Sequence, residues 1–204
     1  AARRSFEDSH QIRTRLAASN PASAEAQRDV SVSLNKLGDV QVAAGDLAAA
    51  RTRFEDSHQT LTRLAAANPG SAEAQRDVSV SLNKLGDVQV AAGDLPAARR
   101  SFEDSHQIRT RLAAANPSSA EAQRDVSVSL EKLGNVQVAA GDLAAASKSF
   151  EDSLQIARRL AAANPGSAEA QRDVSISLNK LGNVQVAAGD LAAARKSFEE
   201  SHQI

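Results

Sequence analysis

The sequence contains no cysteine, methionine, tryptophan or tyrosine, and five phenylalanines are its only Phe, Trp or Tyr residues. Without cysteine there is no disulfide framework, thiolate metal site or cysteine nucleophile. The 24 basic and 25 acidic side chains leave a net charge of −1, which excludes a whole-chain attraction to nucleic acid or an anionic membrane. No apolar run approaches the roughly 20 residues of a membrane span, and because the first residues do not resemble a signal peptide we expect none. We expect a cytoplasmic chain that binds neither nucleic acid nor a membrane.

The rest of the composition is that of a packed, water-soluble chain. Apolar residues make up 42% and charged residues 24%, with alanine dominating the apolar share. A length of 204 residues allows one large domain or two small ones. The missing initiator methionine suggests a piece of a longer protein.

An internal repeat decides between these possibilities. The string Gln-Arg-Asp-Val-Ser recurs every 48 residues, and the first two copies differ at only seven positions. The five phenylalanines keep the same spacing, at Phe6, Phe54, Phe102, Phe150 and Phe198. Near-identical units predict a stacked array rather than separate domains. We therefore expect one array over 1–204, made of repeats 1–48, 49–96, 97–144, 145–192 and a partial repeat 193–204.

Each repeat is predicted to form two antiparallel helices joined by short turns. In the second repeat Gly45-Asp46 ends one helix and caps the next, which runs over 47–68. After Asn-Pro-Gly, Ser71 caps a helix over 72–92. Apolar spacings of three, four and seven give each helix one buried stripe: Ala50, Phe54, Ser57, Leu61 and Leu64, then Ala74, Val78, Leu82, Leu85 and Ala92.

One short segment also fits a β-strand. Residues 29–34 alternate polar and apolar side chains and are rich in valine, as a strand would be. No turn signal brackets the segment, and it lies inside a capped, alanine-rich stretch of helical length. We favour the helix.

The repeats resemble the tetratricopeptide repeat, a helix-turn-helix module with Trp, Leu and Gly on its first helix and Ala and an aromatic residue on its second. Leu34, Leu37 and Gly38 stand at the first three positions, and Ala50 and Phe54 match the last two. The resemblance covers all four repeats. It implies an all-α, right-handed superhelical solenoid of antiparallel helix pairs, and a non-catalytic scaffold that binds a protein or peptide on its concave face.

The sequence departs from this family pattern in two ways. Its period is 48 rather than about 34, and two additional heptads would lengthen both helices while keeping each stripe on one face. Leu34 and Gln41 replace the signature Trp and Tyr, so small side chains must pack by close approach. A mid-helix glycine costs about 1 kcal/mol relative to alanine. We predict that packing explains the glycine in every repeat, at Gly38, Gly86, Gly134 and Gly182.

The string Glu55-Asp56-Ser57-His58 holds the residue types of a catalytic triad. Adjacent helical residues point about 100° apart, so Ser57 and His58 cannot face each other as a triad requires. Successive histidines are a whole repeat apart, which argues against a metal cluster. The fourth repeat carries Leu154 at the histidine position. We predict half-buried packing histidines, no enzyme activity, no metal and no cofactor.

The resemblance assigns ligand contacts to one face of each first helix, the helix that carries Leu34, Leu37 and Gly38 or their equivalents. Two equivalent positions on this face vary between otherwise near-identical repeats. The first is asparagine in three repeats and Glu131 in the other, and the second is aspartate in two repeats and asparagine in the other two. Asparagine amides could bracket an extended peptide backbone, and valines could supply apolar contact; neutral drift of solvated residues is the alternative. The predicted contacts are Val32, Asn35, Asp39, Val42, Val80, Asn83, Asp87, Val90, Val128, Glu131, Asn135, Val138, Ile176, Asn179, Asn183 and Val186.

The ends of the sequence suggest a second function, that of a self-assembling rod. The chain begins and stops inside a second helix, because Ala1 is equivalent to Ala49 and Ile204 to Thr60. Neither end carries the polar capping repeat usual in solenoids. We expect the apolar stripe at the start to take part in head-to-tail association: Ala2, Phe6, Ser9, Ile12 and Leu16.

Overall fold

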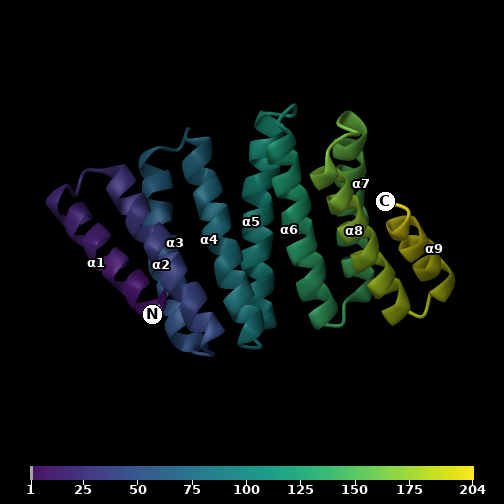
Figure 1. Cartoon of the computed structure of the whole chain (residues 1–204), viewed down its shortest axis with the longest axis horizontal. Coiled ribbons are helices and arrows are strands. Elements are labelled where there is room, and N and C mark those ends of the chain that lie inside the picture. Colours follow the sequence, from purple (N-terminus) through teal and green to yellow (C-terminus); the bar gives the residue numbers. More distant parts are fainter. Residues whose placement is uncertain (1) are drawn as a thin grey trace. The chain divides into compact units, whose positions relative to one another are not determined.

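The computed structural model describes residues 2–204, and its side chains are described from Arg4 onward; Ala1 and the side chain of Ala2 lie outside that part. The described residues form nine α-helices and no strand, which confirms the all-α prediction (Figure 1). The alternative strand over 29–34 is helical. The helices are α1 (Ala2–Ser19), α2 (Ala24–Ala43), α3 (Leu47–Ala67), α4 (Ala72–Ala91), α5 (Leu95–Ala115), α6 (Ala120–Ala139), α7 (Leu143–Ala163), α8 (Ala168–Ala187) and α9 (Leu191–His202).

The chain divides into two compact units, and the boundary falls inside α5. In the first unit, Ala1–Ile108, α1 packs on α2, α2 on α3, and α3 on α4. In the second unit, Arg109–Ile204, α6 packs on α7, α7 on α8, and α8 on α9. Helix-turn-helix pairs therefore build each unit. One continuous array over 1–204 and its right-handed turn stay predictions.

The helix ends follow from the turn residues. Ser71 Oγ accepts a hydrogen bond from the Ala74 backbone N–H at 3.1 Å, and Asp46 Oδ1 accepts one from Ala49 at the same distance. Gly45 has a φ of +78°, a left-handed conformation that glycine adopts without strain. Both predicted caps are confirmed, and the two predicted helices end within one residue of the observed bounds.

Each helix pair is built around a phenylalanine that packs on the glycine of the helix before it, as Phe54 on α3 packs on Gly38 of α2. A Cβ atom on Gly38 would lie 2.5 Å from Cε1 of Phe54, and one on Gly134 would lie 2.5 Å from Cε1 of Phe150. Only a residue without a side chain allows this approach. The prediction that packing explains the mid-helix glycines is confirmed.

Buried serines bring the same helix pairs together. Ser127 and Ser153 are almost inaccessible, and their hydroxyl oxygens lie 2.8 Å apart between α6 and α7. In the first unit the Ser57 hydroxyl donates to the Ser31 carbonyl oxygen across α2 and α3. These small side chains satisfy their own polar atoms while they let the two backbones approach.

Three residues of the predicted stripes are not buried, and Ala74, the first residue of the second stripe, is only partly covered. Leu64 is only partly covered, and the neighbouring Ala65 is buried in its place. Ala92 is exposed because it is the C-cap residue of α4 and lies beyond the last turn that packs on α3. All three residues lie at the ends of a stripe.

Candidate functional site

The predicted contact positions lie on the first helices of the repeats, α2 and α4 in the first unit and α6 and α8 in the second. We call the four positions on each helix, such as Val32, Asn35, Asp39 and Val42 on α2, its valine stripe. Ile176 is partly covered, whereas the other aliphatic side chains are 36–48% exposed: Val32, Val42, Val80, Val90, Val128, Val138 and Val186. Leu34 and Leu37, on the opposite face of α2, are each 6% exposed.

The polar positions of the valine stripes differ in how open they are. Asp87, Asn135, Asn179 and Asn183 are exposed, whereas Asn35, Asp39 and Glu131 are partly covered. Asn83 is buried, with 8% of its surface exposed. The side-chain oxygens of Asn35 and Asn83 are buried without a hydrogen-bond partner. These two amides therefore lie between helices rather than on the open surface.

Lysines next to the valine stripes link successive first helices. Lys84 on α4 pairs with Asp39 on α2, with Nζ 2.6 Å from Oδ1. Lys180 on α8 donates to Asn135 Oδ1 on α6 at 2.9 Å. Sequence reasoning did not predict either of these contacts. The repeated separation of 45 residues, slightly less than one period, is the signal that could have found them.

Two histidines make specific hydrogen bonds. His58 Nδ1 lies 2.9 Å from Ser81 Oγ, and His10 Nδ1 lies 2.8 Å from Ser33 Oγ. Burial lowers the pKa of both imidazoles, helped at His10 by Arg53 and opposed at His58 by Asp104. Both are half-buried, as predicted, but they also have polar partners on the next helix. Because those partners are 23 residues away on another helix, the spacing within one helix could not reveal them.

Replacing His58 with leucine is expected to change stability near neutral pH by less than about 1 kcal/mol. The variant loses one hydrogen bond of about 1 kcal/mol but gains a comparable amount of apolar burial. The folded pKa of His58 lies below the unfolded value of 6.5, so the unfolded chain takes up the proton first. Wild-type stability should therefore fall as the pH drops below 6.5 towards the folded pKa, and the variant should lose less.

Urea unfolding of both proteins at about pH 7.5 and about pH 5 measures this difference. Gln59→Leu is the control, because Gln59 is the exposed neighbour of His58 and does not titrate. A His58→Leu variant with the same pH dependence as the wild type would show that His58 protonates without penalty.

Glu131 is the single acidic residue among the four equivalent positions, which are asparagine in the other repeats. It lies on α6, and its Oε1 accepts a hydrogen bond of 3.3 Å from Ser177 on α8. Burial raises the pKa of Glu131, and Asp173 adds to the increase, while hydrogen bonding from Ser177 and the charge of Lys180 oppose it. In the described part of the chain Glu131 forms no ion pair.

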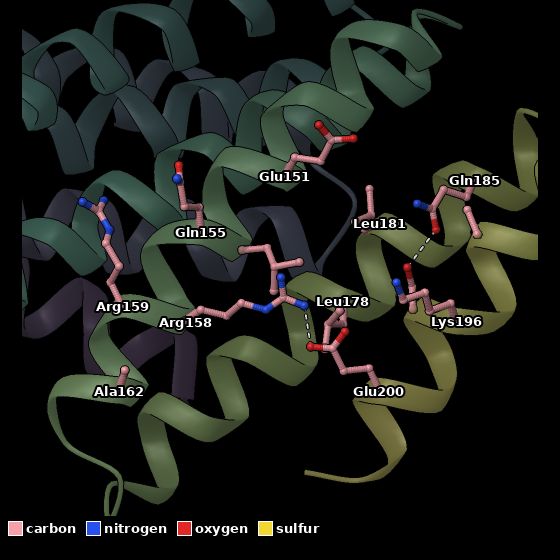
Figure 2. A pocket seen from close by; sticks show the side chains of 13 residues that line it. Glu151, Gln155, Arg158, Arg159, Ala162, Leu178, Leu181, Gln185, Lys196 and Glu200 are labelled. Carbon is pink, nitrogen blue, oxygen red and sulfur yellow. Dashed lines mark hydrogen bonds and ion pairs between the residues drawn. The ribbon is translucent and has the colours of Figure 1, made fainter.

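A groove of about 640 Å³ lies away from the valine stripes, between α7, α8 and α9 (Figure 2). Leu178 and Leu181 contribute to its lining from α8, but each is already at least 93% buried. Arg158 pairs with Glu200 across it, and Ser197 donates to another lining residue, Gln185, at 2.8 Å. Several of its polar groups are thus engaged with each other.

The chain was compared with known families, curated proteins and solved structures. A family model described as tetratricopeptide repeat matches residues 42–106 and 83–149, which together make more than half of the chain. The chain belongs to the tetratricopeptide repeat family. No curated protein matches the sequence.

Solved structures share the fold of this tetratricopeptide repeat chain at low sequence identity. The apo form of RapI is 12% identical with a TM-score of 0.69, over 98% of this chain and 48% of RapI. A Podospora anserina protein with nearly identical TPR-like repeats is 14% identical with a TM-score of 0.60, over 100% and 95% of the two chains. BtubC from P. vanneervenii is 16% identical with a TM-score of 0.58, over 98% and 88%. These likenesses show the fold.

The tetratricopeptide repeat chain shows no sign of a catalytic triad at the predicted string. The Ser57 hydroxyl donates to the Ser31 carbonyl oxygen, whereas His58 bonds to Ser81 on another helix. Among the described residues no group of three His, Asp or Glu side chains could hold a metal ion. No described helix is both long enough and apolar enough to cross a membrane.

An apolar face is exposed on α1. Phe6 is 36% exposed, Ile12 53% and Leu16 59%, whereas the equivalent Phe54 on α3 is 2% exposed. The side chain of Ala2, which the sequence placed in the same stripe, lies outside the described residues. On α8, Gly182 is already covered by Phe198 of α9, since a Cβ there would lie 2.6 Å from the ring. Head-to-tail association through such faces stays a prediction.

Proposed function

We propose that this tetratricopeptide repeat chain is a non-catalytic protein-interaction scaffold, and that an extended peptide or protein segment binds along the valine stripes. Tetratricopeptide repeats generally serve as protein-interaction scaffolds. The position of the bound segment, on the face formed by the first helices, is the specific part of the proposal.

The exposed valines carry this proposal. Valine is a weaker helix former than alanine, and these valines leave 36–48% of their surface exposed in the unbound chain. Each of α2, α4 and α6 nevertheless carries two such valines ten residues apart, which is about 15 Å along a helix. An exposed apolar pair repeated at the same positions of three first helices is the pattern expected of a binding surface.

The polar residues between the valines suit an extended backbone. Asn135 on α6 and Asn179 and Asn183 on α8 are exposed, and each amide offers both a donor and an acceptor. An extended segment presents N–H and C=O groups that need such partners once water is displaced. Valine contacts and amide hydrogen bonds together would favour a peptide over a small, compact ligand.

A randomised peptide display library, selected on the whole chain, tests this function. We expect enriched peptides whose affinity falls at least tenfold in the variant Val80→Arg/Val90→Arg, because two cations then replace the apolar contacts on α4. Gln59→Arg/Arg63→Gln moves a charge within α3 and is the control that should bind normally. Thermal unfolding should change little in all three proteins, since these positions are exposed. Selected peptides that bind the α4 variant at full affinity would place binding elsewhere.

A further inference from the structure

The second unit differs from the first at two positions that converge on one serine. On α6, Glu131 replaces the asparagine of the other repeats, and on α7, Leu154 replaces histidine. Ser177 on α8 contacts the first of these directly. Leu154 occupies the place relative to Ser177 that His58 occupies relative to Ser81, 23 residues before the serine in each case.

In the first unit the serine leaves the amide without a partner. The Ser81 hydroxyl donates to the Val78 carbonyl oxygen at 2.8 Å, and His58 Nδ1 lies 2.9 Å from the same hydroxyl oxygen. A hydroxyl has one hydrogen to donate, so the imidazole must be the donor in the second bond. Asn35, 46 residues before Ser81, keeps a buried oxygen with no hydrogen-bond partner.

In the second unit the same hydroxyl is directed to a carboxylate. Ser177 donates to Glu131 Oε1 at 3.3 Å, across the same separation of 46 residues. Leu154 offers no polar atom, so no imidazole competes for the hydroxyl. The two substitutions together anchor a carboxylate on the valine stripe of α6, between Val128 and Asn135.

Among the described residues Glu131 has no ion-pair partner, and the two units use the equivalent lysines Lys84 and Lys180 differently. Asp39 is paired with Lys84 in an ion pair, whereas Lys180 is directed to the neutral Asn135 amide. The Ser177 hydroxyl holds the Glu131 side chain in place but does not neutralise it. A partly buried carboxylate in this condition gains most from a cation that arrives with a ligand, because charge-assisted hydrogen bonds are stronger than neutral ones.

We propose that Glu131 recognises a lysine or arginine of the bound segment, so that the second unit selects basic peptides. This inference rests on the proposed function, because the segment must lie along the valine stripes to reach Glu131. The flanking Val128 and Val138 would contact the apolar neighbours of that basic residue. Glu131 is only partly covered, so its carboxylate can accept the cation while it keeps the hydrogen bond from Ser177.

The test compares display selections on the wild type and on Glu131→Asn, which restores the residue of the other three repeats. We expect wild-type peptides to share a lysine or arginine at one fixed position and to bind Glu131→Asn at least tenfold more weakly. Their affinity for the wild type should increase as the pH rises from about 4 to 7 and Glu131 loses its proton, with no such rise for the variant. Glu151→Asn, an equal charge change at an exposed position of α7, should bind them normally.

The outcomes separate the two proposals. Wild-type peptides without a shared basic residue, or with equal affinity for Glu131→Asn, would overturn the role of Glu131. If those peptides still lost affinity in a Val128→Arg/Val138→Arg variant, the scaffold function would stand. Peptides that bind independently of all stripe variants, or the absence of any enriched peptide, would overturn both. Thermal unfolding confirms that each variant is folded.

Discussion

Replacing Phe150 with alanine is expected to lower the free energy of unfolding by about 3–5 kcal/mol. Phe150 is 1% exposed and shares a buried cluster with Ala146, Leu154, Leu178 and Leu181 from α7 and α8. The ring also fills the space above Gly134 on α6. Alanine would leave a cavity between three helices, and the buried leucines around it could close it only in part.

The chain contains a matched control for this substitution. Phe6→Ala removes the same side chain from the same local sequence on α1, but Phe6 is 36% exposed. We expect it to cost about 1 kcal/mol or less. Urea unfolding followed by circular dichroism gives both values, and hydrogen exchange in α7 and α8 shows whether the second unit alone is weakened. Equal losses for the two variants would contradict the packing described for Phe150.

The local signals of the sequence predicted the helices well. Caps such as Asp46 and Ser71 act within three residues of the chain, so they need no knowledge of the tertiary structure. The glycine at Gly38 could also be interpreted from sequence, because its helix-propensity cost demands a packing reason. The 48-residue period then extended the predicted helix pair to the other repeats of the described residues.

The candidate site was harder to predict because its contacts cross between repeats. Whether Asn35 on α2 is covered depends on how α4 is offset against α2, which periodicity within one helix does not encode. The Lys84–Asp39 pair and the His58–Ser81 hydrogen bond could not be predicted from the sequence for the same reason. The valines lie at the surface because a residue opposite a buried stripe is exposed whatever the offset, and their contact with a ligand stays a prediction.

Replacing Gly134 with alanine is expected to destabilise the protein by about 1–3 kcal/mol, although alanine is the better helix former by about 1 kcal/mol. The added Cβ would lie 2.5 Å from Cε1 and 2.6 Å from Cζ of Phe150. Such distances require the ring or the backbone to move. The Phe150 ring is enclosed on all sides, so α6 and α7 would have to separate.

Two further glycines give this prediction its controls. Gly166→Ala should be close to neutral, because the added Cβ has no atom within 4 Å and the equivalent position is alanine at Ala22. Gly182→Ala should cost less than Gly134→Ala: its Cβ would meet the ring of Phe198, which is only partly buried and can shift towards solvent. Thermal and urea unfolding rank the three variants. A stabilised Gly134→Ala would mean that helix propensity, not the phenylalanine contact, decides this position.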